Sequence, residues 1–465
     1  MKGLHWFRRD LRINDNRALA KASQECSELD GIFIFDSQIL STLPKNDRRV
    51  SYIIESIYLL QNSLKKNGIK LHIVKGTPQT ILPKFCLKYK INTVYTNRDY
   101  EATAKIRDEK IFHLLKKNNI QLKDFKDHVV FEAREILNLS GSLYKVFTPY
   151  KNKWLSEFKT ELIREEKMSV VKNQKKGIDL LSRKEIYKIA AFQKTKLWLQ
   201  PGEEAAKESA RHFFSKNIKD YKRSRDFPSL NEKCSLLSTA IRFGEISIRE
   251  LLRQALKKKS EGASTWVSEL IWREFYQMIL DQCPHVVSGA FKKEFNAIHW
   301  PGKLKNFQKW KDGETGFPLV DAAMRHFKNT GLMHNRLRMV TASFLVKDLL
   351  IDWRLGEKYF AATLMDFDLA ANNGGWQWSA STGCDAQPYF RVFNPTTQSQ
   401  RFDPEGTFIK EHLPELKELN KKEIHEPYKK KDLFSKKLNY PTPIVDHSKQ
   451  RLLAIQLFKD ARENK

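Results

Sequence analysis

Short apolar runs alternate with amphipathic stretches over the first 130 residues. Four runs have the length and composition of buried strands, at residues 3–7, 31–35, 71–74 and 93–96. Helical periodicity separates or follows these runs near residues 16–26, 51–66, 78–89 and 103–117. This alternation predicts βαβ units, and therefore an α/β domain with a parallel, doubly wound sheet over residues 1–130.

The pattern changes twice after residue 130. Residues 131–200 are polar, Lys-rich around 156–196 and weakly periodic, so we expect a connector that packs on the surface. From residue 201 onward, apolar positions recur at helical spacing in 236–257, 264–282, 318–329, 333–351 and 356–370. The spacing predicts an all-α domain over 201–465, in which the Lys-rich segment 417–437 is a solvated surface.

Composition adds a charge argument to this pattern. The chain has 465 residues, of which 41% are hydrophobic, enough for at least one large core. Lys and Arg number 83 against 55 Asp and Glu, and the resulting charge of +28 favours a polyanionic partner such as DNA or RNA. The alternative is a generally basic, solvated surface. No run of about 18 apolar residues and no signal-peptide pattern is visible, so we expect an intracellular, cytoplasmic protein.

Two common kinds of site lack support in the sequence. The five cysteines lie far apart without a CxxC pair, so we expect neither a disulfide framework nor a metal centre. The first strand is followed by Arg8-Arg9-Asp10-Leu11-Arg12 instead of a GxGxxG turn. A dinucleotide on the α/β domain is therefore unsupported, and salt bridges between elements are the alternative use of this charged turn.

Residues 366–383, DFDLAANNGGWQWSASTG, form the most informative stretch. Asp368, Asn372 and Trp376 are spaced i, i+4 and i+8, so in a helix they share one face, with Trp378 turned aside. A carboxylate, an amide and an indole on one stripe are an unusual combination to bury. The alternative is a core helix whose two polar residues are satisfied by neighbours.

A second helical stretch repeats this combination of side chains. Trp266, Glu269 and Arg273 share a face, and Trp272 lies one turn beyond Glu269. A carboxylate flanked by indoles suits recognition of a flat polar ring by stacking and hydrogen bonding. Alternatively, Glu269 and Arg273 form an i, i+4 ion pair beside core tryptophans.

Two further segments carry weaker signals. Asn335 and Met339 are one helical turn apart, and an amide beside a thioether suits a nucleobase pocket, although helix packing with exposed arginines is the better explanation of this segment taken alone. The segment 234–239 places Ser235 and Ser238 where a helix opens. Hydroxyls and free backbone N–H groups at a helix start can hold a phosphate, but most such serines are only caps.

Taken together, these motifs resemble the photolyase/cryptochrome family, and within it the class I cyclobutane pyrimidine dimer photolyases. The resemblance rests on HWFRRDLRINDNRAL at 5–19, YKVFTPYKNKWL at 144–155 and SELIWREFYQ at 268–277. It continues in TGLMHNRLRMVTASFLVKDLLIDW at 330–353 and LAANNGGWQWSASTGCDAQPYFRVFNP at 369–395, and so covers nearly the whole chain. It implies a light-dependent DNA repair lyase.

The resemblance also implies an FAD site in the helical domain. The matching positions are Tyr221, Ser235, Leu237, Ser238, Trp266, Arg273, Asn335, Arg338, Asp366, Asp368 and Asn372. By this match, Asp368 accepts from flavin N3–H, Arg338 pairs with Asp366, and Asn372 faces flavin N5. Cryptochromes often carry Asp or Cys at the last position, so Asn372 favours repair over signalling.

Two more sets of residues follow from the resemblance. Trp376, Trp353 and Trp300 match a triad that carries electrons to the flavin. The lesion pocket corresponds to Glu269, Trp272, Asn335, Met339 and Trp378, with Arg336 and Arg391 reaching flanking phosphates. Relatives that repair (6–4) photoproducts carry histidines near Asn335 and Met339, so the cyclobutane dimer in UV-damaged DNA is the expected substrate.

The chain departs from the family pattern at the antenna. Thr103-Ala104 replaces an Asn-Glu pair, and Ser288 stands near the position of an expected lysine, so the second chromophore is a folate, a deazaflavin or absent. Cys234 and Leu236 replace a Thr and a basic residue of the phosphate turn. We expect a monomer; a signalling cryptochrome and a non-catalytic DNA-binding flavoprotein are the alternative functions.

Overall fold

The computed structural model describes residues 1–171, 177–429 and 438–463. Contacts divide the chain into two units that interleave along the sequence. Unit 1 consists of Met1–Ile136, Asn152–Lys219 and Ser235–Glu274, and unit 2 of Leu137–Lys151, Asp220–Cys234 and Phe275–Lys465. Within the described ranges, no helix is long and apolar enough to cross a membrane.

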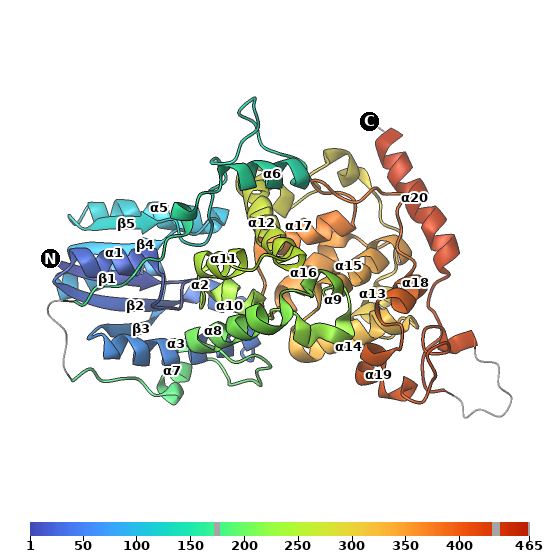
Figure 1. The fold of residues 1–465 in the computed structure, drawn as a ribbon, viewed down its shortest axis with the longest axis horizontal. Helices are drawn as coiled ribbons and strands as arrows, with labels where there is room; N and C mark the ends of the chain where they lie inside the picture. The colour runs from blue at the N-terminus through green and yellow to red at the C-terminus, as the bar shows by residue number, and fades with distance from the viewer. Residues whose placement is uncertain (172–176, 430–437, 464–465) are drawn as a thin grey trace. The chain divides into compact units, whose positions relative to one another are not determined.

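A five-stranded parallel sheet with the order β3-β2-β1-β4-β5 lies in unit 1 (Figure 1). Its strands are β1 (Lys2–Phe7), β2 (Glu28–Asp36), β3 (Lys70–Gly76), β4 (Thr93–Asn97) and β5 (Gln121–Phe125). The four predicted strands and the doubly wound α/β class are confirmed. The fifth strand was not predicted, because β5 reads QLKDF and is an edge strand without an apolar run.

Helices pack on the sheet because its central strands β2, β1 and β4 are buried on both faces. The helices of this part are α1 (Arg17–Glu25), α2 (Ser37–Leu40), α3 (Arg48–Lys66), α4 (Pro78–Tyr89) and α5 (Ala102–Lys116). Leu4 and Trp6 of β1 share one core cluster with Leu82 of α4 and Leu115 of α5. Tyr95, which points to the opposite face from Val94, contacts the Cys26 thiol at the end of α1. The helices predicted here are confirmed to within a few residues.

The rest of unit 1 is helical. It contains α7 (Arg183–Ala190), α8 (Glu203–His212), α10 (Ser238–Phe243), α11 (Ile248–Leu256), the first part of α12 (Glu261–Gln282) and the turns η1 (Thr160–Ile163) and η2 (Phe213–Asn217). The helix predicted over 236–257 is broken at Gly244, which has a φ of +64°. A Cβ there would collide with the Arg9 carbonyl, so this break requires glycine.

A buried ionic network ties α11 to the turn that follows β1. Arg12 pairs with Asp127 at 2.6 Å, and Arg249 pairs with both Asp15 and Asp127 at 2.9 Å. Burial would raise the pKa of Asp127, but the Arg12 and Arg249 guanidiniums outweigh it and hold this pKa below its ordinary value. Part of the charged turn after the first strand therefore forms salt bridges between elements.

Unit 2 is helical. It contains α9 (Tyr221–Ser224), α13 (Leu304–Asp312), α14 (Pro318–Thr330), α15 (Asn335–Ser343), α16 (Trp353–Thr363), α17 (Leu369–Ser379), α18 (Pro395–Phe402), α19 (Thr407–His412) and α20 (His447–Glu463). Short turns connect them: η3 (Pro228–Lys233), η4 (Pro284–Val287), η5 (Lys293–Ala297), the π-helical η6 (Phe344–Asp348), η7 (Pro414–Leu416) and η8 (Pro427–Lys429). The helix α6 (Phe147–Glu157) crosses the boundary between the two units.

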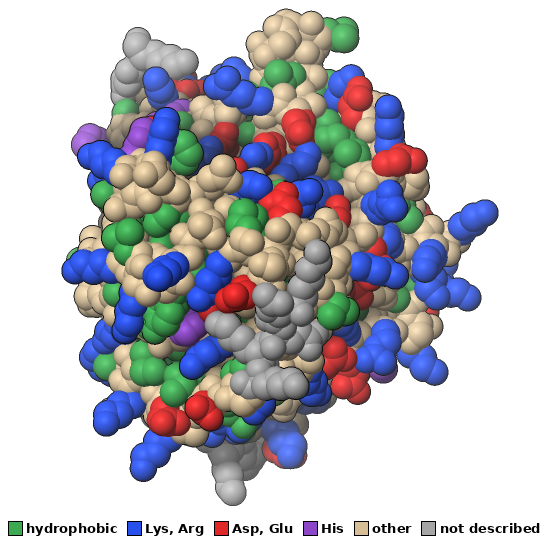
Figure 2. Space-filling view, turned by 90° about the vertical axis from the view of Figure 1, so that its left-hand side faces the viewer, with side chains coloured by type: hydrophobic (Ala, Val, Ile, Leu, Met, Phe, Trp, Pro, Cys, Tyr) green, Lys and Arg blue, Asp and Glu red, His purple; other side chains and the backbone are tan. Residues whose placement is uncertain are grey.

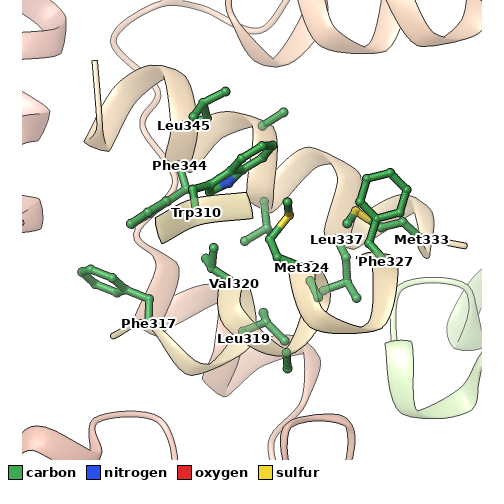
Figure 3. Close-up of a cluster of buried hydrophobic side chains, with 14 of the residues drawn as sticks. Trp310, Phe317, Leu319, Val320, Met324, Phe327, Met333, Leu337, Phe344 and Leu345 are labelled. Carbon is green, nitrogen blue, oxygen red and sulfur yellow. The ribbon is translucent and has the colours of Figure 1, made fainter. Parts of the chain in front are cut away.

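The core of unit 2 is built around α14 (Figure 3). Val320, Met324 and Phe327 recur at helical spacing and face the side chains of α15, η6 and Trp310 of α13. The helix predicted over 333–351 ends at Ser343 and continues as η6, and the one predicted over 356–370 is replaced by α16 and α17. Of the predicted solvated segment 417–437, residues 430–437 lie outside the described residues.

Candidate functional site

Helix α17 carries two of the three residues that the sequence placed on one helical face. Asn372 and Trp376 lie one turn apart on this helix, and both are buried. Asp368 precedes the helix as its N-cap, and its carboxylate accepts a hydrogen bond from the Ala371 N–H at 3.3 Å. The prediction that Asp368 continues the helical face is therefore wrong, because the helix begins at Leu369 and the carboxylate caps it.

The Asn372 amide has a fixed orientation. Its Nδ2 donates to the Glu357 side chain at 2.8 Å and to the Glu357 backbone carbonyl at 3.2 Å. A backbone carbonyl can only accept, so the atom facing α16 must be the nitrogen and Oδ1 points elsewhere. Burial raises the pKa of Glu357. The sequence did not reveal Glu357, since nothing in its spacing links it to Asn372.

The three tryptophans predicted to carry electrons belong to one cluster in unit 2. Trp376 and Trp353 are buried in the core, and Trp300 is half-buried against its edge. Trp376 meets Phe360 edge-on, with ring centroids 4.9 Å apart. Trp300 also meets Phe458 of α20, at 6.0 Å. The cluster therefore runs from the buried side of α17 toward the surface.

Helix α15 brings Asn335 and Met339 to consecutive turns, as predicted. The expected ion pair between Arg338 and Asp366 is present at 2.7 Å. The other oxygen of Asp366, Oδ1, is buried without a hydrogen-bond partner among the described residues. Gly375, one turn after Asn372, faces open space. An unpaired acceptor and free space are features that a bound polar ligand would use.

Arg336 is less available than the sequence suggested. Its guanidinium forms an ion pair with Asp226 at 2.8 Å and lies 4.3 Å from the centre of the Phe402 ring. Arg391 is exposed in the loop that follows α17. Of these two predicted phosphate contacts, Arg391 is the more accessible in unit 2.

The remaining predicted site residues belong to unit 1, apart from Tyr221 at the start of α9 and Trp378 on α17 in unit 2. They are Ser235, Leu237, Ser238, Trp266, Glu269, Trp272 and Arg273. The helix predicted to open at 234–239 begins at Ser238, with Leu237 as N-cap and Leu236 at a φ of +52°. Ser235 therefore lies before the helix start.

The predicted face of α12 is helical throughout. Trp266 packs against Phe213 and Phe214, with ring centroids 5.7 and 5.1 Å apart, so it also belongs to the core. Arg273 donates to the His128 carbonyl at 2.7 Å. The neighbouring Glu274 is fully buried and accepts from the Trp154 indole at 2.7 Å, a structural role that the sequence did not reveal.

Unit 1 also contains a cavity of about 440 Å³ at the carboxyl ends of β1 and β2. Its walls include Trp6, Phe33 and Phe35, and the guanidinium-bearing Arg8 and Arg9. Strand order reverses around β1, where ligands of doubly wound sheets usually bind.

One wall of this cavity carries an unsatisfied acceptor. The Oε1 atom of Gln79 is buried and has no hydrogen-bond partner among the described residues. Arg8 is paired with Asp108 at 2.6 Å, and Arg9 with Asp99 at 3.3 Å. The cavity thus combines apolar walls with a free acceptor, although no Gly-rich nucleotide motif leads into it.

Positive charge is spread widely over the surface. On the face drawn in Figure 2, Lys and Arg side chains stand over the whole area, with acidic and apolar side chains between them. This distribution matches the net charge of +28. It supports salt-dependent attraction of a polyanion without marking one binding patch.

Two family models match the chain. The model described as DNA photolyase matches residues 3–168, and the FAD binding domain of DNA photolyase matches residues 266–460. The deoxyribodipyrimidine photo-lyase of Alkalihalophilus pseudofirmus is 39% identical, covering 98% of this chain and 97% of that protein. The deoxyribodipyrimidine photo-lyase of Escherichia coli is 38% identical and covers 99% of both.

Solved structures agree with these matches. A bacterial class III photolyase from Agrobacterium tumefaciens superposes with a TM-score of 0.90 at 32% identity, covering 99% of this chain and 98% of that chain. An archaeal photolyase from Sulfolobus tokodaii with two FAD molecules gives a TM-score of 0.85 at 33% identity, covering 99% and 100%.

Proposed function

The chain belongs to the DNA photolyase family, and from that membership we propose that it is a light-dependent deoxyribodipyrimidine photo-lyase that splits cyclobutane pyrimidine dimers in DNA. Similarity over nearly the full length, with the neutral Asn372 at its matching position, is the observation that carries the proposal. We infer that the cofactor is FAD, which in its reduced form supplies the electron that light transfers to the lesion.

Residues of unit 2 fit this cofactor on two structural grounds. The buried Oδ1 of Asp366 lacks a hydrogen-bond partner among the described residues and can accept from a bound ligand. The open space beside Gly375 leaves room next to Asn372. We propose that Tyr221, Asn335, Arg338, Asp366, Asp368 and Asn372 bind FAD, together with Ser235, Leu237, Ser238, Trp266 and Arg273 of unit 1.

The orientation of Asn372 has a chemical consequence. With Nδ2 held by Glu357, the amide offers its oxygen, which accepts a hydrogen bond from a nitrogen that carries hydrogen. A flavin nitrogen that carries hydrogen is thereby favoured over one that has only a lone pair. We propose that this preference helps to retain the reduced cofactor that repair needs.

Electron supply is assigned to Trp376, Trp353 and Trp300. Indoles can give up an electron, and a row of them replaces one long transfer with several short ones. Their shared cluster, in which Trp376 and Trp353 are buried and Trp300 is half-buried, supports a relay that starts from Trp300. The triad would restore the reduced cofactor after it has been oxidised.

For the lesion we propose Glu269, Trp272, Asn335, Met339 and Trp378. A dimerised base pair is weakly stacked, so turning it out of the duplex costs less than for normal bases. Indoles can stack on the displaced bases, and Glu269 can hydrogen-bond to their polar edges. Arg391 would contact a flanking phosphate directly, whereas Arg336 would first exchange its ion pair with Asp226.

Several coarser assignments accompany this function. The partner is UV-damaged DNA, and we propose that the enzyme acts in the cytoplasm as a monomer. We also propose a division into an antenna domain at 1–130, a connector at 131–200, whose residues 172–176 lie outside the described residues, and an FAD- and lesion-binding domain at 201–465.

The cavity in unit 1 is proposed as the site of a second chromophore. A planar ring would lie between Trp6, Phe33 and Phe35, and the unpaired Gln79 Oε1 would accept from it. The Sulfolobus tokodaii photolyase holds two FAD molecules, which supports a flavin or deazaflavin over a folate. Ile53→Trp fills the cavity, so it should release the second chromophore while FAD is retained; release of both would contradict the assignment.

The repair activity itself can be tested by light. Purified, reduced protein is mixed with UV-irradiated oligothymidine, and absorbance near the thymine band is followed under blue light. Absorbance should recover in light, with no recovery in darkness or with undamaged oligothymidine. Tight binding without recovery would exclude the enzyme and leave a DNA-binding flavoprotein.

A further inference from the structure

The loop between α17 and α18 in unit 2, residues 381–391, has two unlike parts. Its first residues, from Ser381 to Cys384, are buried, and its end exposes Phe390 and Arg391. Ser381 and Asp385 have positive φ angles of 63° and 48°, a conformation that costs energy for residues other than glycine. Contacts elsewhere must therefore hold the loop in this form.

Lys347 of the π-helical turn η6 closes this loop. Its side chain is fully buried, and its Nζ donates to Ser381 Oγ at 2.9 Å and to the Arg391 carbonyl at 3.0 Å. Both ends of the loop thus meet on one nitrogen atom. Compact surface loops whose ends lie close together are often functional.

The burial of this amine needs a reason. An amine taken out of water is costly unless its hydrogen bonds are replaced. The adjacent carboxylate, Asp348, accepts a 2.6 Å hydrogen bond from His447 of α20 when Nδ1 of that ring carries the proton. Burial lowers the pKa of Lys347 to about 7, but even a neutral amine has two N–H groups, one for each acceptor. The two bonds therefore do not depend on its charge.

Other contacts hold the buried part of the loop. The Lys292 N–H donates to the Thr382 carbonyl at 3.0 Å, and the Cys384 thiol to the Lys145 carbonyl at 2.9 Å. The Phe147 N–H donates to Asp385 at 2.9 Å. These bonds fix the first half, whereas Lys347 joins the exposed Arg391 end to the helical core.

The position of η6 links this loop to the lesion pocket. η6 directly continues α15, on which Asn335 and Met339 lie. π-helical turns are rare and are frequent at functional sites, because the extra residue redirects the side chains that follow. One continuous segment therefore carries two predicted lesion contacts and the amine that closes the loop.

We propose that Lys347 is a positioning residue for DNA binding: by joining the two ends of the 381–391 loop, it fixes where Arg391 meets the phosphate backbone beside the lesion. This inference rests on the proposed function. Arg391 is exposed and has a long side chain, so its reach is set by where its backbone is held. A loop that occupies its binding arrangement only part of the time lowers the apparent affinity in proportion.

The test compares dissociation constants for UV-irradiated single-stranded oligothymidine, using FAD-loaded variants. Lys347→Met removes both hydrogen bonds at nearly constant side-chain volume. If the loop then occupies its DNA-binding arrangement about one tenth of the time, the dissociation constant should rise about tenfold. Ser381→Ala removes one bond and should raise it about threefold by the same relation. His447→Gln is the matched control: it loosens the same turn from α20 and should leave the affinity within about twofold of wild type.

A salt titration of DNA binding distinguishes the positioning of Arg391 by Lys347 from a general loosening of the protein. Arg391→Ala in the wild type should reduce the salt slope of binding by about 1, and in the Lys347→Met background it should change little. Full affinity and an unchanged salt slope in Lys347→Met would overturn the proposal. If Lys347→Met does not retain FAD, Ser381→Ala decides, and wild-type affinity in that variant also overturns it. Failure of the wild type to prefer irradiated DNA would instead reject the proposed function.

Discussion

Asn372→Asp should make the folding stability of unit 2 depend on pH. The new carboxylate would replace a donor that now lies 2.8 Å from a Glu357 carboxylate oxygen and 3.2 Å from the Glu357 carbonyl. Two unit charges about 3 Å apart repel by roughly 5 kcal/mol at an effective dielectric constant of about 20. The two carboxyl groups avoid this repulsion by keeping one proton between them. Retaining that proton costs about 1.4 kcal/mol for each unit by which the pH exceeds the ordinary pKa of a carboxyl group.

The sign of the effect follows from the proton. The pKa of the pair is raised in the folded state, since Glu357 is already raised by burial and gains a second carboxylate. Stability is therefore retained at low pH and lost as pH rises through the folded pKa. We expect the variant to lose about 1 kcal/mol at pH 5 and roughly 3 kcal/mol at pH 8, after allowance for solvent at this partly exposed pair.

Urea unfolding of the FAD-loaded protein, followed by circular dichroism at both pH values, measures this difference. Asn372→Ala is the uncharged control: it removes the donor that lowers the Glu357 pKa, so its loss should rise only slightly from pH 5 to pH 8, without the repulsion of a second carboxylate. Adding Glu357→Gln to Asn372→Asp supplies an amide donor and should restore most of the loss at pH 8. An equal loss at both pH values in Asn372→Asp would refute the contact between residue 372 and the Glu357 carboxylate.

Three further changes test other parts of the molecule. Trp353→Phe should slow photoreduction of oxidised flavin at least tenfold, because it interrupts the tryptophan cluster, yet leave repair by chemically reduced enzyme nearly unchanged; equal loss of both would reject the relay. Asp127→Asn leaves Arg12 and Arg249 without a shared carboxylate and should cost about 3 kcal/mol at pH 7 in urea unfolding. Because the pKa of Asp127 is lowered in the folded state, its contribution begins to fall as pH drops below about 4, so the difference between the two proteins should shrink progressively in acid, and a constant difference would argue against this role. Trp378→Ala should weaken binding of irradiated oligothymidine by about 1–3 kcal/mol, as for loss of one stacked base, and wild-type affinity would remove Trp378 from the pocket.

Periodicity located most elements because it reports burial directly. The strands β1, β2 and β4 are buried along nearly their whole length, and each contains a short, mainly apolar run, as expected for strands covered on both faces. The edge strand β5 is half-exposed and polar, so it left no signal. The break at Gly244 was also missed, because it depends on the close approach of the Arg9 carbonyl, which lies far away in sequence.

The site shows the same limit at the level of single residues. The spacing of Asn372 and Trp376 predicted their shared helical face, since both lie inside α17. Asp368 is one residue outside the helix, and a shift of that size is decided by capping rather than by periodicity. Glu357 and Lys347 had no local signal, because their partners come from segments that only the fold brings near them.

Two adjacent residues of α16 fix the positions of Trp376 and Asn372 on α17. A Cβ on Gly356 would collide with the Trp376 ring, so only glycine lets the indole pack against this helix. The next residue, Glu357, holds the amide of Asn372 one turn earlier on α17. The indole and the amide are therefore fixed by one helix contact, and a change that moves α16 should alter the proposed electron supply through Trp376 and the orientation of the Asn372 amide together. This coupling explains why a glycine followed by a half-buried acid belongs to the site although neither residue is predicted to touch the flavin or the lesion.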